Sequence, residues 1–316
     1  MTLVDREHFY ATIIKWEHVP YCQCVGWVDA QATNRRELVY LLDEDIACVG
    51  HLKRYAGIRY LMLQAPALRY DGVKAGKVSA FYREVMDLAD IVELNDQSVY
   101  NPQREVALRQ AGYLRPVGSF SYQLTSIIDL MQPLQPDRNW SRKMDQIKGL
   151  HLEVIEQVSE KDIQDYMALY AKMCTAKNMS VPHTTEYIRI LLEDKHFRLF
   201  FETTDEGERV ASLLIHMVGT HAGGLYAATS EKGKRLFAGF AIYRDVLPYL
   251  ASQGYRSFDN EKMGASTHST NAVYQFKQGM GGTLTPLNGE WQWCRRKWMP
   301  LALYLVKKYI WKRTQA

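Results

Sequence analysis

Two carboxylates in the second half of the chain occupy positions where catalytic residues often lie. Asp259 and Glu261 fall at the end of the short segment 256–260, which is predicted to be a strand. A carboxylate there could accept a proton directly or through water, and Tyr274 could do the same. Both carboxylates would also suit a turn that leads into a helix. The pattern alone therefore leaves a catalytic and a structural interpretation open.

The sequence lacks the motifs that would indicate other common chemistries. It contains no Gly-x-Gly-x-x-Gly, Walker loop, His-Glu-x-x-His or Gly-x-Ser-x-Gly pattern. Its nine histidines are scattered, and His216 and His221 flank a predicted turn, where a partly exposed histidine is the simpler interpretation. Cys22-x-Cys24 has no second Cys or His pair at a finger-like spacing. We therefore expect no metal and five reduced thiols.

Length and composition indicate a globular protein with one large or two medium domains. The 316 residues are 47% hydrophobic and 12% aromatic, with a formal net charge of +4. Asp5, Arg6 and Glu7 stand where a signal peptide would need an apolar run. The longest strongly apolar stretch, 298–306, is far shorter than a membrane-spanning helix. We expect a cytoplasmic protein.

Hydrophobic periodicity predicts the same succession of elements twice. In the first half the predicted elements are strands at 36–43, 46–55 and 58–64, a helix at 74–88, a strand at 91–94, a helix at 102–110 and an extended segment at 113–125. In the second half they are a helix at 159–177, strands at 198–203, 210–218 and 223–229, a helix at 237–251, a strand at 256–260 and a helix at 271–278. This order predicts a duplication.

Short local similarities at a nearly constant offset support that duplication. Asp43-Glu44 matches Asp205-Glu206, and 81–85 matches 242–246. We therefore predict two tandem α/β (α+β) domains, each a mixed central sheet flanked by helices. The predicted segments are residues 1–135, residues 136–300 and a tail at 301–316, with the join within 131–149, where Pro133 and Pro136 interrupt regular structure.

The tail predicts a basic amphipathic helix. Ala302, Leu305, Val306, Tyr309 and Ile310 recur at helical spacing after Pro300. Seven Lys and Arg residues and no acidic residue follow Glu290, so the rest of the chain is net acidic. The apolar face could dock on the protein's own core. Alternatively, the helix could rest on an anionic membrane, which would place the protein peripherally on the inner face.

The doubled order of elements resembles the tandem acyl-CoA N-acyltransferase (GNAT) fold of the FemABX-like peptidyl aminoacyltransferases. The resemblance covers nearly the whole chain, and its local pieces are 226–229, 254–259 and Tyr274-Gln275-Phe276-Lys277. The last piece is the most specific, because it resembles the family's Phe-Lys pair near the reaction centre. Trp27 resembles a Trp near the family's start.

The resemblance implies attack of a primary amine on a thioester or ester held between two splayed parallel strands. Lys277 and the backbone near Tyr226 would support charge on the carbonyl oxygen, and Asp259, Glu261 or Tyr274 would accept the proton. A lysine near a helix carboxyl end is also favoured by the helix dipole without any catalysis. The substrate contacts implied by the resemblance are Phe276, Tyr274, Tyr187, His183 and Trp27.

The family's donor loop is present in altered form. Arg235, Gly239 and Ala241 fall in the loop that would hold a coenzyme A pyrophosphate, but Leu236 replaces a polar residue. The expected donor is acyl-CoA or aminoacyl-tRNA, with no metal. Gln31 and His183 stand where members acting on nucleotide-linked precursors carry basic residues, which weakens that particular substrate.

The acceptor implied by the resemblance is an amine of a cell-envelope precursor: an amino sugar, a peptide or a lipid-linked molecule. Transfer RNA is a further possible partner, and DNA is not expected. The alternative hypothesis is a non-catalytic GNAT-like scaffold that binds an anionic or lipid partner through its basic tail.

Overall fold

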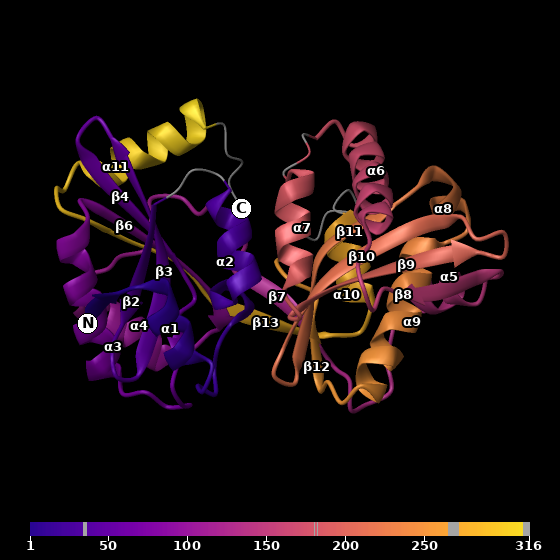
Figure 1. Cartoon of the computed structure of the whole chain (residues 1–316), viewed down its shortest axis with the longest axis horizontal. Coiled ribbons are helices and arrows are strands. Elements are labelled where there is room, and N and C mark those ends of the chain that lie inside the picture. Colours follow the sequence, from indigo (N-terminus) through magenta and orange to yellow (C-terminus); the bar gives the residue numbers. More distant parts are fainter. Residues whose placement is uncertain (34–36, 180, 182, 265–271, 312–316) are drawn as a thin grey trace. The chain divides into compact units, whose positions relative to one another are not determined.

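The chain folds into two compact units of nearly equal size. The computed structural model describes residues 1–33, 37–179, 181, 183–264 and 272–311. Unit 1 comprises Met1–Leu124 with Thr285–Ala316, and unit 2 comprises Thr125–Leu284 (Figure 1). These units divide the chain at other points than the predicted segments 1–135 and 136–300, because the last strand of the chain joins unit 1.

Unit 1 is built on a sheet whose described strands follow the order β1-β2-β3-β4-β6-β13. The strands are β1 (Thr2–Val4), β2 (Glu37–Leu42), β3 (Ile46–Tyr55), β4 (Ile58–Gln64), β6 (Ile91–Val99) and β13 (Thr283–Cys294), and the short β5 (Ala67–Leu68) pairs with β3. The helices are α1 (Arg6–Ile13), α2 (Val25–Ala32), α3 (Ala75–Val85), α4 (Pro102–Gln110) and α11 (Met299–Leu305), and helical turn η3 (Val306–Ile310) continues α11. The predicted meander of β2, β3 and β4 is confirmed.

Unit 2 repeats this arrangement, with the strand order β7-β12-β11-β10-β9-β8. The strands are β7 (Leu124–Asp129), β8 (Leu150–Val154), β9 (Phe197–Thr204), β10 (Arg209–Val218), β11 (His221–Thr229) and β12 (Ser257–Asp259). The helices are α5 (Arg138–Met144), α6 (Glu160–Ala176), α7 (Thr185–Glu193), α8 (Glu231–Arg235), α9 (Ala238–Ser252) and α10 (Ala272–Gly279). The strand and helix order predicted for the second half is confirmed.

The two halves exchange their final strands. β7, which follows the first set of elements, pairs antiparallel with β12 of unit 2. β13, which follows the second set, pairs antiparallel with β6 of unit 1. Local breakers such as Pro133 and Pro136 indicate where regular structure stops. They carry no information about which sheet a strand joins, and the predicted boundary differs for that reason.

Alternation along β10 assigns the two faces of the unit 2 sheet. Leu213 and Ile215 are buried in the core that α9 covers, with Phe200 and Phe258. The intervening residues, including His216, point to the other face, where α6 and α7 lie (Figure 1). Helix α6 begins at the predicted cap, because Ser159 and Asp162 form a complete capping box. None of the described helices is long and apolar enough to cross a membrane.

Candidate active site

The central parallel strands of unit 2 diverge. β11 and β12 pair only from His221–Ser257 to Gly223–Asp259, after which β12 ends and β11 continues to Thr229. A register shift opposite Leu214 and Ile215 leaves one extra residue in β11, between Gly224 and Tyr226. Such a bulge bends a strand and changes the direction in which its side chains and backbone groups point. The edge of β11 beyond Gly223 is therefore not paired by β12.

The corresponding strand of unit 1, β4, does not extend past its parallel partner. β4 and β6 pair in parallel from Tyr60–Ile91 to Gln64–Asn95, the last residue of β4. The neighbouring β3–β4 pair runs from Gly50–Leu63 to Tyr55–Ile58 without a register shift. Of β4 and β11, it is thus β11 that carries a bulge and extends past its parallel partner.

A connected group of polar side chains lies at the carboxyl end of β12. The Nε2 atom of His216 lies 2.9 Å from Oε1 of Glu261. The Glu261 backbone N–H donates to Oδ1 of Asp259 at 2.7 Å, and the Thr125 hydroxyl donates to the same carboxylate. The Nζ atom of Lys277 donates to the carbonyls of Glu261 and Lys262 at 3.1 and 3.0 Å. The structure thus brings the candidate residues Asp259, Glu261 and Lys277 together and places His216 beside them.

Local backbone features create the space and the turn for this group. A Cβ atom on Gly223 would lie 2.3 Å from Nε2 of His216, so glycine is what allows the imidazole to lie over β11. Glu261 has a φ of 58°, in the left-handed region that residues other than glycine rarely adopt. The hydrogen bonds from Lys277 and to Asp259 hold this strained turn in place.

Burial tunes the ionisable groups of the site. It raises the pKa of Asp259 to about 6, and the nearby Glu261 carboxylate acts in the same direction, whereas the hydrogen bonds from Thr125 and the Glu261 N–H oppose it. Burial lowers the pKa of Lys277, and the two carboxylates oppose that shift. The site therefore combines a carboxyl group whose pKa is raised to about 6 with a partly buried cation. That combination suits proton transfer and charge stabilisation.

A second, aromatic group adjoins β11 on the α6 and α7 face. The His183 ring centroid lies 4.2 Å from that of Tyr226 and 5.4 Å from that of Tyr187, and the two tyrosine hydroxyls are 3.3 Å apart. Tyr170 completes the group at 5.0 Å from His183. Burial lowers the pKa of His183 to about 4, so the imidazole is neutral at pH 7. It does not supply the positive charge that a diphosphate would require.

The other predicted substrate contacts have different surroundings. Phe276 packs among Trp140, Phe240 and Tyr243, with ring centroids 5.0 to 5.5 Å away, so it anchors α10 to the core. Tyr274 is half-buried on the same helix. Trp27 lies in unit 1, where its Nε1 atom donates to Oε1 of Gln64 at 3.2 Å. Trp27 and Lys277 thus belong to different units.

The predicted donor loop precedes α9. Phe237, at the N-cap, has a φ of 58° and makes no side-chain cap, so the amino end of this helix stays available to an anion. Gly239 leaves room for the Thr229 side chain, since a Cβ there would lie 3.2 Å from Oγ1 of Thr229. Ala241 is buried against the core. Exposed Arg235 makes no ion pair among the described residues, whereas Lys232 and Lys234 bind Glu208 and Glu231.

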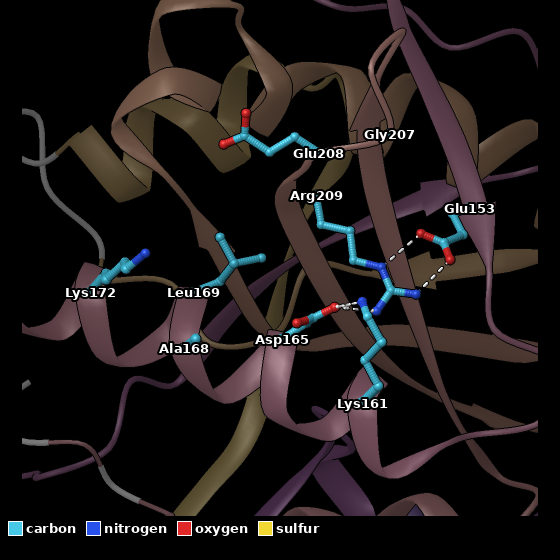
Figure 2. A pocket seen from close by; sticks show the side chains of 9 residues that line it. All are labelled: Glu153, Lys161, Asp165, Ala168, Leu169, Lys172, Gly207, Glu208 and Arg209. Atoms are coloured by element: carbon cyan, nitrogen blue, oxygen red, sulfur yellow. Dashed lines mark hydrogen bonds and ion pairs between the residues drawn. The ribbon is translucent and has the colours of Figure 1, made fainter.

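A cavity of about 420 Å³ elsewhere on unit 2 is a charged surface feature outside this site (Figure 2). Its central residue, Arg209, donates to Glu153 at 2.9 Å and to Asp165 at 2.8 Å, and also pairs with Asp162. These carboxylates raise the pKa of the guanidinium. Arg209 is thus fully engaged in tying α6 to β8 and β10, and the cavity contains none of the predicted site residues.

His216 and Gly223 are the residues that sequence reasoning missed. The signal in the sequence that could have indicated them is the glycine pair 223–224 in a predicted strand, because two residues without a Cβ atom leave room above the strand for a side chain of the neighbouring strand β10. Asn260 is a further addition: it is 3% exposed, and neither amide atom has a hydrogen-bond partner among the described residues. Within the same residues, no group of three or more His, Cys, Asp or Glu is placed to hold a metal ion.

Comparison with known proteins places this geometry in a recognised fold. Residues 137–274 match the family model of the acetyltransferase (GNAT) domain. FemX is similar at 11% identity, with a TM-score of 0.73 and coverage of 97% of this chain and 99% of FemX. The L-PGS of Bacillus licheniformis is similar at 14% identity, with a TM-score of 0.66 and 97% coverage of both chains.

A third solved structure agrees with these two. It is the C-terminal domain of a putative lysylphosphatidylglycerol synthetase from Agrobacterium fabrum, at 14% identity, with a TM-score of 0.63 and 95% coverage of both chains. None of the curated proteins matches the sequence. The predicted resemblance is thereby confirmed at the level of the fold: residues 137–274 match the GNAT acetyltransferase domain, and the chain shares its fold over nearly its whole length with FemX.

Proposed function

We propose that the protein transfers an acyl or aminoacyl group to a primary amine of a cell-envelope precursor, with unit 2 holding the donor. The observation that carries this proposal is the divergence of β11 from β12 beside Asp259, Glu261 and Lys277. An unpaired strand edge presents backbone groups to a carbonyl, and the adjoining carboxylates can receive the proton of an amine. In unit 1 the equivalent strand β4 does not extend past its partner β6, and this unit would serve another role.

In the proposed reaction the amine nitrogen attacks the carbonyl carbon of a thioester or ester. The carbonyl electrons move to oxygen, where backbone N–H groups of β11 and the positive charge of Lys277 would stabilise them. Asp259 or Glu261 takes the proton lost by the nitrogen. Collapse of the intermediate reforms the carbonyl and expels the thiolate or the ribose oxygen, which takes up a proton as it leaves.

Lys277 has two tasks in this proposal. Its ammonium is bound by the carbonyls of Glu261 and Lys262, so it holds the strained turn that carries the carboxylates. Its charge also lies in a buried environment, where electrostatic stabilisation is stronger than in water. Phe276 supports both tasks by fixing α10 in the core.

The nature of the substrates rests on a narrower set of observations. The uncapped amino end of α9, Arg235 and Gly239 suit a phosphate-bearing donor, which both acyl-CoA and aminoacyl-tRNA are. The names of two similar structures, L-PGS and lysylphosphatidylglycerol synthetase, favour an envelope acceptor for this chain as well. Both donors are cytoplasmic molecules, so we also propose a cytoplasmic location.

The direct test is a transfer assay read by mass spectrometry. Purified protein is incubated with acyl-CoA or aminoacyl-tRNA donors and with amino-sugar, peptide and aminolipid acceptors. We expect an amide product with one donor class and its near loss in Lys277→Ala. A folded protein that gives no product with any pair would favour the alternative, a non-catalytic scaffold that binds an anionic or lipid partner.

A further inference from the structure

The carboxyl-terminal helix has two faces with different surroundings. Met299 and Leu303 are buried against Tyr60 and Ile91, so α11 lies on β4 and β6 of unit 1 (Figure 1). Lys307 continues this inner face: it is 4% exposed and forms an ion pair with Glu93. The helix therefore docks on its own unit, as one of the two sequence interpretations expected.

The docked face is not the predicted one. Of the predicted apolar stripe, Leu305, Tyr309 and Ile310 are 44%, 63% and 70% exposed. The difference follows from the pairing of Lys307 with Glu93, a contact between residues far apart in the sequence. This ion pair turns a charged position inward, and the apolar positions one step away on the helix consequently point outward.

The outward residues form one continuous apolar stripe. Trp298 and Leu301 are 57% and 55% exposed and continue the stripe of Leu305, Tyr309 and Ile310 along α11 and η3. Single exposed apolar residues are ordinary, but a row of five on one helix face marks an interaction surface. We call this row the outer stripe.

The charges around the outer stripe have one sign. Arg296 and Lys297 are exposed at its start, and Lys308 lies beside it, with its Nζ atom 3.1 Å from the Tyr304 hydroxyl. Lys312 and Arg313 follow in the sequence and lie outside the described residues. No acidic residue follows Glu290.

The nearest acidic groups on adjacent elements are already paired with basic ones. Glu93 binds Lys307, and Asp90 lies 2.9 Å from the Arg295 guanidinium. The β3–β4 hairpin also adjoins the end of the helix, because the Tyr55 and Trp311 ring centroids are 6.3 Å apart. The hairpin adds exposed Tyr55 and the basic residue Lys53, whereas Arg54 on the same strand lies 3.9 Å from the Glu37 carboxylate.

We propose that the outer stripe docks unit 1 onto the surface of an anionic lipid bilayer. A row of Trp, Tyr, Leu and Ile flanked by Lys and Arg matches a surface that is apolar at its boundary and negatively charged above it. A protein partner would need its own acidic rim around an apolar groove. The uniformly basic flank and the aromatic residues at both ends favour the lipid surface. This inference depends on unit 1 alone and is independent of the proposed reaction.

The test is flotation of the full chain with vesicles, in the absence of donor or acceptor. Vesicles of phosphatidylcholine containing about 30% phosphatidylglycerol are compared with phosphatidylcholine alone, at salt concentrations from about 50 to about 500 mM. We expect binding only to the anionic vesicles and release by salt. Each basic residue at the surface should contribute roughly fivefold.

The deciding variant is Leu301→Glu/Leu305→Glu. Its matched control is Ile14→Glu/Val106→Glu, which places the same charges at exposed apolar positions of unit 1 away from the tail. We expect at least about tenfold weaker vesicle binding for the first variant and unchanged binding for the control. Both should keep the wild-type melting temperature.

A second readout covers the case in which that variant folds poorly. Brominated phosphatidylglycerol should quench tryptophan emission in the wild-type protein and quench less in Trp298→Phe. Equal binding of the wild-type protein and of Leu301→Glu/Leu305→Glu to anionic vesicles would overturn the proposal. Failure of the wild-type protein to bind anionic vesicles at low salt would overturn it as well. A dimer that Leu301→Glu/Leu305→Glu converts to monomers, without vesicle binding, would instead assign the stripe to a second copy of the chain.

Discussion

The contact between Gly223 and His216 provides a sharp structural test. A Cβ atom at position 223 would lie 2.3 Å from Nε2 of His216 and 3.2 Å from the Asp259 carbonyl oxygen. Gly223→Ala must therefore displace the imidazole and break its 2.9 Å contact with Glu261. Overpacking costs about 1–3 kcal/mol, and a hydrogen bond to a charged group contributes about 1.5–3 kcal/mol. The lower chain entropy of alanine offsets about 0.5–1 kcal/mol.

The net expectation is that Gly223→Ala destabilises unit 2 by about 1.5–5.5 kcal/mol. A double-mutant cycle with His216→Ala isolates the cause. Once the ring is gone, the alanine at 223 should cost less than about 1 kcal/mol, which gives a coupling energy above about 1 kcal/mol. Amide hydrogen exchange of β10 and β11 reports the free energy of opening for this unit directly.

Gly76→Ala is the matched control for this cycle. A Cβ atom at Gly76 would have no heavy atom within 4 Å, and the residue lies in the first turn of α3 in unit 1. The change should be neutral or slightly stabilising there. Additive effects of Gly223→Ala and His216→Ala, or a harmless Gly223→Ala, would refute the assigned position of the imidazole over β11.

Three further predictions concern the proposed reaction. Lys277→Ala should lower turnover by about ten- to a thousandfold in a folded protein. Lys277→Arg should restore turnover only in part, because a planar guanidinium spreads its charge and does not replace the compact charge of an ammonium group. Unchanged turnover in Lys277→Ala would remove Lys277 from the site. Asp259→Asn should remove an inflection near pH 6 from kcat/KM, since burial raises the pKa of Asp259 to about 6. Because the pKa is raised in the folded state, the Asp259 carboxyl stabilises the fold at low pH and loses this contribution as the pH rises through about 6. The free energy of unfolding of Asp259→Asn should therefore rise relative to that of the wild type as the pH rises through about 6, and urea unfolding measures this difference. Gly239→Val should raise the KM for the donor, whereas substitutions in 74–80 of unit 1 should not, and equal effects in both units would contradict the division of roles.

The sequence predicted most of the secondary structure because local patterns determine it. Alternating apolar residues define the meander of β2, β3 and β4, and the Ser159–Asp162 capping box starts α6. The exchange of β7 and β13 depends instead on pairing between distant segments. No local pattern encodes that choice, so the predicted boundaries near 135 and 300 differ from the compact units.

Part of the candidate site follows from the sequence, because the position at a strand end points to Asp259 and Glu261 and the resemblance points to Lys277. Asp259, Glu261 and Lys277 meet, because β12 and α10 deliver them to the same turn. The sequence pattern predicts a turn position for His216, whereas its surroundings depend on the strand register that sets it opposite Gly223. Long-range pairing also governs the tail, where Glu93 decides which side of α11 faces inward.

The division of roles between the two units can be measured by locating the bound donor. Amide hydrogen exchange is recorded for the full chain with and without a saturating, unreactive analogue of acyl-CoA or aminoacyl-tRNA. The proposed function predicts slower exchange in 224–229 of β11 and 238–241 of α9, with no change in 60–64 of β4 or 75–80 of α3. Protection confined to β4 and α3, or no protection in unit 2 with either analogue, would contradict the assignment of unit 2 as the acyl-transfer unit.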